Sequence, residues 1–214
     1  IDGPLDLVVF PCENADVTGA DVDTFVDADD DGDADGFATT DTGQARIAQV
    51  WTGLLGVDGK RHSLGNLKDA GAVLLVFLSN RCPMTRAYEG RLKALAASFK
   101  KRGLRVVAVS IGQSPTDRFD KMIARAALSK YNFPYCIDLT QQLGRRYGAT
   151  CTPHAFLLDR KRRVAYMGAI DDNVDPGKIE HHYLRDAIRA VLAGKRPEVF
   201  ETLQKGCEIK YLAR

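Results

Sequence analysis

A single cysteine stands where a buried strand is expected to end and a helix to begin. Cys82 lies in the stretch Phe77-Leu-Ser-Asn-Arg-Cys-Pro-Met-Thr85. A cysteine at a helix start faces unpaired N–H groups and the positive end of the helix dipole, and both favour the thiolate over the thiol. Arg81 and Arg86 add positive charge nearby. Because the thiolate is the form that attacks a disulfide or a peroxide, the pattern predicts a reactive thiol at Cys82, provided that it is partly exposed.

The elements around Cys82 alternate between strands and helices. The apolar run from Ala72 to Leu78 is typical of a strand buried on both faces, and Pro83 to Lys101 has an apolar stripe at helical spacing. We expect further strands at 104–111, 133–138, 154–158 and 164–170, and helices from Ser114, at 140–147 and at about 179–192. The second helix is expected to bury Phe119, Met122, Ile123 and Ala126. This order predicts an α/β fold in which parallel strands precede an antiparallel hairpin and helices cover both faces of the sheet.

Five motifs follow one another along residues 46–211. They are Cys82-Pro-Met-Thr85, Tyr88-Glu-Gly-Arg-Leu92, Tyr147-Gly-Ala-Thr-Cys-Thr-Pro-His154, Gly168-Ala-Ile-Asp-Asp172 and Gly206-Cys-Glu-Ile-Lys-Tyr211. Together they resemble the thioredoxin-like superfamily, and within it the peroxiredoxin-like AhpC/TSA (redoxin) branch with one active-site cysteine. The resemblance implies a thioredoxin-like fold with a central mixed β-sheet flanked by helices. It also implies that Cys82 is the attacking cysteine, that Thr85 replaces the second thioredoxin cysteine, and that Pro153 is a cis-proline beside the nucleophile.

The resemblance implies further roles around Cys82. The backbone of Thr152 and the ring of Pro153 are expected to shape a groove for a peptide or a mixed disulfide. Arg81 and His154 are candidate substrate contacts, although His154 can equally serve only to cap the sheet. The candidate catalytic residues are Cys82, Thr85, Cys151 and Cys207. Cys151, Cys207 or a second molecule is then expected to provide the resolving thiol.

Two departures from the related families leave the substrate open. Without a cysteine at Thr85, the local two-thiol exchange of thioredoxin is not available. Peroxiredoxins carry the pattern P-x-x-x-T-x-x-C, and here Ser79 stands for the threonine while Leu75 occupies the proline position. Both a peroxide and a disulfide therefore remain candidate substrates. Cys136 lies within an expected strand and is interpreted as a core residue.

The first 45 residues differ in charge from the rest of the chain. They carry thirteen acidic side chains and no Lys or Arg, whereas the remainder carries 30 basic and 15 acidic side chains. Alternating aspartates with a glycine at the turn suit Ca²⁺, although Ala38 stands where an EF-hand places its glutamate. The string resembles the calcium-binding repeats of the thrombospondin type 3 kind. We expect Ca²⁺ to be bound by Asp27, Asp29, Asp31, Asp33 and Asp35; the alternative is a solvated, self-repelling acidic linker.

The composition excludes several classes of protein. The chain has 214 residues, of which 45% are hydrophobic and 27% charged, as in a globular protein, and no apolar run is long enough to span a membrane. Five scattered cysteines do not form a disulfide framework, and no zinc, haem or nucleotide motif occurs. The basic runs at 100–102 and 160–163 are expected to be solvated, so no nucleic-acid partner is predicted. The redox chemistry is expected to need no cofactor.

We predict three parts: an acidic, largely irregular segment at 1–45, a thioredoxin-like domain at 46–196, and a flexible C-terminal tail at 197–214. The predicted function is that of a thiol-dependent oxidoreductase, with a peroxide or disulfide substrate and an external thiol reductant. The alternative is a non-catalytic thioredoxin-like binding module whose acidic segment gives a Ca²⁺-dependent contact to a partner. Since the sequence starts at Ile1, we expect a processed chain or a fragment. The calcium-type segment favours a periplasmic or secreted location.

Overall fold

The centre of the fold is strand β4 (Ala72–Leu78), every residue of which is fully buried. The structure is a computed structural model that describes residues 46–47 and 51–213. β4 pairs in parallel with β5 (Leu104–Ser110) and in antiparallel fashion with β8 (His154–Leu158). Because all seven side chains of β4 are apolar, the strand can bury both of its faces beneath helices.

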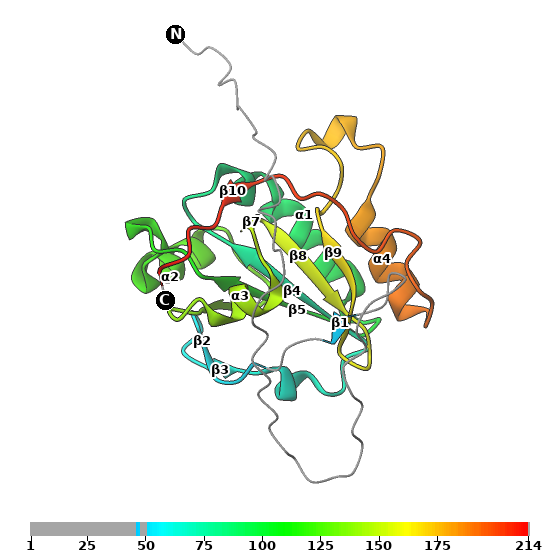
Figure 1. The fold of residues 1–214 in the computed structure, drawn as a ribbon, viewed down its shortest axis with the longest axis horizontal. Helices are drawn as coiled ribbons and strands as arrows, with labels where there is room; N and C mark the ends of the chain where they lie inside the picture. The colour runs from blue at the N-terminus through cyan, green and yellow to red at the C-terminus, as the bar shows by residue number, and fades with distance from the viewer. Residues whose placement is uncertain (1–45, 48–50, 214) are drawn as a thin grey trace.

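Among the described residues, eight strands form one mixed sheet in the order β1-β9-β8-β4-β5-β6-β2-β3 (Figure 1). The strands not yet bounded are β1 (Arg46–Ile47), β2 (Leu54–Gly56), β3 (Arg61–His62), β6 (Tyr135–Ile137) and β9 (Arg163–Gly168). β7 (Cys151–Thr152) and β10 (Cys207–Glu208) form a separate antiparallel pair. This second sheet brings the C-terminal segment next to the loop that precedes β8.

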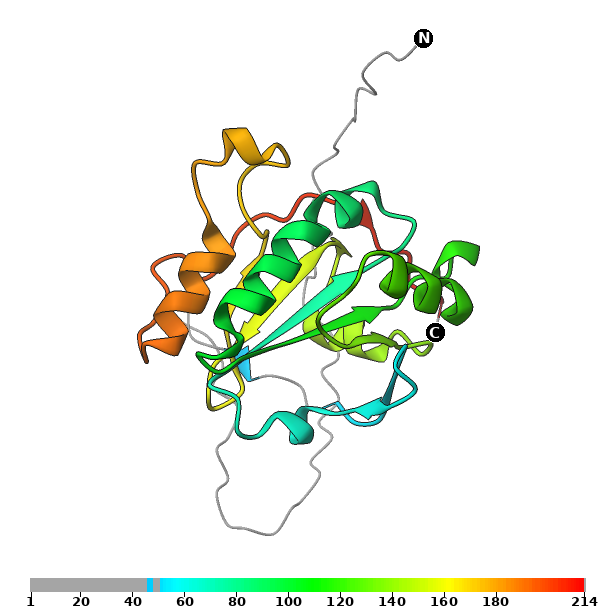
Figure 2. The same ribbon diagram turned by 180° about the vertical axis from the view of Figure 1, so that it is seen from behind.

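Helices cover both faces of the sheet. α1 (Pro83–Lys100), α2 (Phe119–Leu128) and α4 (Tyr183–Leu192) pack on the face that includes Leu74 and Val76, and Figure 2 shows these helices in front of the strands. α3 (Gln142–Tyr147) packs on the opposite face, with Leu75 and Phe77. Successive strand residues point to opposite faces, so β4 supplies both cores at once. The predicted thioredoxin-like fold, a mixed sheet flanked by helices, is confirmed.

Two helix starts differ from the prediction. Pro115 opens only a short 3₁₀ turn, Pro115–Asp117, and α2 begins at Phe119 because Arg118 has an extended backbone with ψ 149°. The predicted burial of Ile123 is wrong: the side chain is 44% exposed, because it borders an open hollow between α2 and the turn after β2. The last helix begins at Tyr183 rather than near residue 179, since Ile179 is also extended after a second 3₁₀ turn, Pro176–Lys178. A further 3₁₀ turn, Leu64–Leu67, precedes β4.

The C-terminal segment does not have the expected flexibility. The amide of Ile209 donates to the Thr150 carbonyl at 2.9 Å, and the Tyr211 hydroxyl donates to the Ala149 carbonyl at 2.6 Å. Further back, the hydroxyl of Thr202 accepts from the Ala169 amide at 2.9 Å. Figure 1 shows this red segment running past β7 with β10 at its middle. The tail is therefore an ordered part of the domain surface next to β7.

Two predictions concern other parts of the chain. The calcium ligands Asp27, Asp29, Asp31, Asp33 and Asp35 lie outside the described residues. Within the part that the structure describes, no helix has the length and apolar character needed to cross a membrane.

Candidate functional site

Cys82 is the N-cap residue of α1, directly after the loop that follows β4. Its backbone is extended, with φ −75° and ψ 118°, and Pro83 takes the first helical position, which suits its fixed φ. The carbonyl of Cys82 accepts from the Arg86 amide at 3.3 Å, which begins the helical ladder. The predicted position of the cysteine between strand and helix is therefore found in the structure.

The loop before β8 covers the Cys82 thiol. The Sγ atom lies 2.9 Å from the carbonyl oxygen of Thr152, and the Thr152–Pro153 peptide bond is cis, as the resemblance implied. Cys82 has an exposed fraction of 0%, so the expectation of partial exposure is wrong. The cause is that Thr152 and the C-terminal segment both lie against the thiol. A reagent can therefore reach the sulfur only through local movement of this cover.

Cys207 is a thiol that the structure brings close to Cys82. β10 pairs with β7 so that Cys207 stands opposite Thr152, whose carbonyl contacts the Cys82 sulfur, and the two thiols influence each other's pKa. Cys207 is only half-buried, whereas Cys82 is fully covered. The tail thus places the Cys207 sulfur close to the Cys82 sulfur, and both residues are free thiols rather than a disulfide.

The two thiols have opposite pKa shifts. Burial raises the pKa of Cys82, but the Cys207 thiol, the Thr152 side chain and the Thr85 amide hydrogen-bond to its sulfur and outweigh burial, so the net pKa lies below the ordinary value. Burial and the neighbouring Cys82 raise the pKa of Cys207 to about 12. Of the two thiols, Cys82 is therefore the one that ionises more readily.

A buried carboxylate holds the loop that carries Cys82. Asp117, which is 2% exposed, accepts from the Ser79 hydroxyl at 2.9 Å and from the Asn80 amide at 2.6 Å. The Asn80 side chain donates to the Thr116 carbonyl at 2.8 Å and accepts from the Tyr135 hydroxyl at 3.2 Å. Because the proton of Ser79 is directed at Asp117, this hydroxyl serves the loop rather than the Cys82 sulfur. Asp117 is a positioning residue that sequence reasoning missed.

Replacing Asp117 by Ala should destabilise the protein by about 2–6 kcal/mol, because two donors lose their buried acceptor at a cost of roughly 1–3 kcal/mol each. Asp117→Asn should cost less, since the amide oxygen can still accept from Asn80. Urea unfolding measures the difference. Asp120, exposed on α2, provides the control, and its Ala variant should change stability by less than about 0.5 kcal/mol. Equal losses for the two Ala variants would contradict the positioning role.

Two other predicted site residues, Thr85 and Arg81, lie near the two thiols. Thr85 is buried, and its hydroxyl accepts from the Ser79 amide at 3.3 Å, while its own amide faces the Cys82 sulfur. Arg81 is exposed and lies close enough to Cys207 to lower its pKa slightly against the larger raising effects. Thr85 and Arg81 therefore both belong to the surroundings of the thiol pair.

His154 and Cys151 are buried beside the cis-proline. Burial lowers the pKa of His154 to about 3, so the ring is neutral near pH 7, and its Nδ1 accepts from the Thr150 amide at 3.4 Å. A neutral ring cannot supply positive charge to a thiolate. The Cys151 sulfur lies 4.0 Å from the Pro153 carbonyl and is fully buried. Cys136 is also fully buried, and burial raises its pKa to about 12, which agrees with its interpretation as a core residue.

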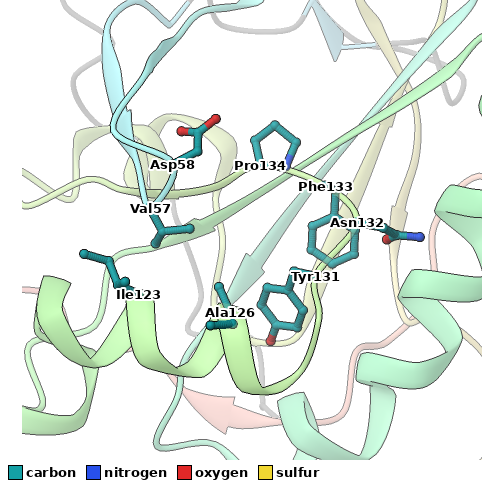
Figure 3. A pocket seen from close by; sticks show the side chains of 9 residues that line it. Val57, Asp58, Ile123, Ala126, Tyr131, Asn132, Phe133 and Pro134 are labelled. Carbon is teal, nitrogen blue, oxygen red and sulfur yellow. The ribbon is translucent and has the colours of Figure 1, made fainter.

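Two open hollows lie outside the thiol pair. Figure 3 shows one of about 410 Å³ between α2 and the β2–β3 turn, lined by Val57, Asp58, Ile123, Ala126, Ala127, Tyr131, Asn132, Phe133 and Pro134. The second, also about 410 Å³, borders the loop of Cys82 through Asn80 and continues along Thr116, Lys121 and Leu128. Neither of these two hollows is lined by a cysteine.

Among the residues that the structure describes, one group of side chains has metal-ligating chemistry. Ligand atoms of Asp172, Glu180 and His181 lie within 4.8 Å of one another. Asp172 also accepts from the Glu180 amide at 3.1 Å, which ties the group together as a loop contact. It includes neither cysteine of the thiol pair and supplies no group to it.

The chain resembles one protein family and several known proteins. The model of the AhpC/TSA family matches residues 48–167. The thiol-disulfide oxidoreductase ResA of Geobacillus thermodenitrificans is 28% identical over 108 residues, which make up 50% of this chain and 59% of that protein. A solved hypothetical protein from Sinorhizobium meliloti 1021 is 33% identical, with a TM-score of 0.73, over 82% of this chain and 98% of its own. A candidate thiol:disulfide interchange protein DsbE from Chlorobium tepidum is 25% identical, with a TM-score of 0.57, over 69% of this chain and 96% of its own.

Proposed function

Because this chain belongs to the AhpC/TSA family, we propose that it is a thiol-dependent oxidoreductase in which Cys82 attacks the substrate and Cys207 resolves the product. The observation that carries the proposal is the placement of Cys207 opposite Thr152, whose carbonyl contacts the Cys82 sulfur, together with the opposite pKa shifts of the two thiols. A nucleophile with a lowered pKa and a protonated partner within bonding reach are the two groups that a dithiol–disulfide cycle needs. The match to part of a thiol-disulfide oxidoreductase supports the same class of chemistry.

The cycle proceeds in two steps. With a hydroperoxide, the Cys82 thiolate attacks the terminal oxygen, the O–O bond breaks, and an alcohol leaves after protonation, so that Cys82 becomes a sulfenic acid. With a disulfide, the same thiolate forms a mixed disulfide and releases one thiolate. In either case Cys207 then loses its proton and attacks the Cys82 sulfur. A Cys82–Cys207 disulfide forms, and water or the second substrate thiol leaves.

The exposure of the two sulfurs predicts where an external thiol attacks to close the cycle. Cys207 is half-buried and Cys82 fully buried, so the reductant reaches Cys207 first. Attack there forms a mixed disulfide between the reductant and Cys207 and expels Cys82, which is the better leaving group because its thiol has the lower pKa. A second reductant thiol then attacks this mixed disulfide, leaves as the oxidised reductant and frees Cys207, so both protein thiols are regenerated.

Brief treatment of the reduced protein with dilute hydrogen peroxide, followed by mass spectrometry of its peptides, tests the proposal. We expect a disulfide between the peptides of Cys82 and Cys207, with Cys136 left as a thiol. Peroxide and a small disulfide are separate arms of the experiment, and either one that yields the pair supports the cycle. Inertness of Cys82 toward both would favour the alternative of a binding module without redox chemistry.

We also propose two features from the sequence alone. The aspartates at 27–35 suit Ca²⁺, and a calcium-binding segment favours an extracytoplasmic location. A calorimetric titration of the full chain with Ca²⁺ tests the first point, with heat of binding as the expected result.

A further inference from the structure

The C-terminal segment occupies the edge of β7 beside the reactive sulfur. Cys207 and Glu208 pair with Thr152 and Cys151, and the Ile209 amide donates to the Thr150 carbonyl at 2.9 Å. An extended polypeptide that approached Cys82 along this loop would need the same backbone groups. They are already used within the chain, so such a polypeptide must first displace residues 206–209.

A glycine lets the segment approach this closely. A Cβ atom added at Gly206 would lie 2.2 Å from the carbonyl oxygen of Thr152 and 2.7 Å from its carbonyl carbon, both of which are backbone atoms. Any other residue at 206 would therefore push the chain away from β7. The contact between the two segments depends on the absence of a side chain at this position.

Side chains hold the segment on both sides of the pairing. The Gln204 side chain donates to the Thr150 hydroxyl at 2.5 Å, and the Tyr211 hydroxyl donates to the Ala149 carbonyl at 2.6 Å. Beyond them, Gln141 accepts from the Leu212 amide at 2.8 Å, and the Arg145 guanidinium lies 4.5 Å from the centre of the Tyr211 ring. The cover over Cys82 is thus anchored by several buried or half-buried contacts and not by β10 alone.

We propose that residues 204–211 set the substrate class of Cys82: small oxidants react with the covered site, whereas disulfides within polypeptides react only when the segment is released. This inference rests on the proposed function, because it concerns which oxidant the same thiolate meets. A hydroperoxide needs a path only a few atoms wide, and local fluctuation of the cover supplies it. A polypeptide disulfide needs the β7 edge itself, so its apparent rate falls with the fraction of molecules whose segment is released.

The test compares two oxidants on three proteins. Hydrogen peroxide and insulin, which contains disulfides within polypeptides, are each mixed with the reduced full chain. Loss of the Cys82 thiol is followed by rapid alkylation and mass spectrometry. Gly206→Ala loosens the segment without changing either cysteine. Gly65→Ala is the control, since its Cβ would meet only the Ser63 hydroxyl, at 3.8 Å. If Gly206→Ala does not fold, Tyr211→Phe removes one anchor and keeps the ring.

For Gly206→Ala we expect the rate with insulin to rise by about tenfold or more, while the rate with hydrogen peroxide changes less than about threefold. Gly65→Ala should match the wild type with both oxidants. Equal insulin rates for the wild type and the loosened variants would overturn the inference and leave the proposed function standing. A folded protein whose Cys82 reacts with neither oxidant would overturn the proposed function and this inference together.

Discussion

Replacing Cys82 by Ser should lower turnover of peroxide and of disulfide substrates by at least about 1,000-fold, because the attacking atom is lost. Neither Cys207 nor Cys136 can take its place. Cys207 has a pKa raised to about 12 and therefore stays protonated near neutral pH, and Cys136 is fully buried with its pKa raised to about 12. The measurement is steady-state consumption of hydrogen peroxide or of a small disulfide in the presence of an external thiol.

Cys136→Ala is the matched control for this result. It removes a thiol from the core without touching the thiol pair, so turnover per folded molecule should stay within about twofold.

The wild-type rate should also rise with pH until the Cys82 thiol is ionised. Since its pKa is lowered, the half-maximum should lie at a lower pH than for an ordinary cysteine thiol, and lowering the pH through this midpoint removes the reactive thiolate. Undiminished activity of Cys82→Ser would place the chemistry elsewhere.

Replacing Cys207 by Ser should leave the first oxidation of Cys82 nearly intact and slow complete turnover by roughly 100-fold. An intramolecular thiol acts at a high effective concentration, whereas an external thiol must reach a fully buried sulfur. After one equivalent of hydrogen peroxide, Cys82 should therefore persist as a sulfenic acid, and an excess should carry it to the sulfinic acid. Trapping with a sulfenic-acid reagent and mass spectrometry distinguishes these states from a disulfide.

Cys151→Ala is the comparison that separates the two candidate resolving thiols. If Cys207 resolves the product, Cys151→Ala should still form the Cys82 disulfide at close to the wild-type rate, while Cys207→Ser should not. The opposite pattern, with a disulfide between Cys82 and Cys151, would contradict the role assigned to Cys207.

The part of the site that sequence could predict is the part made by local patterns. The apolar run of β4 and the apolar stripe of α1 fix a strand and a helix, and the cysteine between them must then cap the helix. The cis bond before Pro153 was expected for a different reason, because the resemblance to the thioredoxin-like superfamily implied it. The strand and the helix depend on residues close together in the sequence, where periodicity acts directly.

The remainder depends on pairings between distant residues. Asp117 holds Asn80 across 37 positions, and nothing in the residues around Asp117 signals a buried acceptor. β10 has only two residues, too few for a period to be visible, and it forms because Gly206 fits against the Thr152 backbone. The burial of Cys82 follows from that same distant contact. Local patterns therefore predicted the position of Cys82 at the start of α1 but not the segment that covers it.

The segment that covers Cys82 follows every strand of the large sheet in the chain. During synthesis from the N-terminus, β4, β5, β8 and β9 leave the ribosome before residues 204–211 do, and domains begin to fold as they emerge. During synthesis there is therefore an interval in which the sheet has formed but residues 204–211 do not yet cover the Cys82 thiol. In that interval the nascent protein should react with bulky partners that the complete domain excludes.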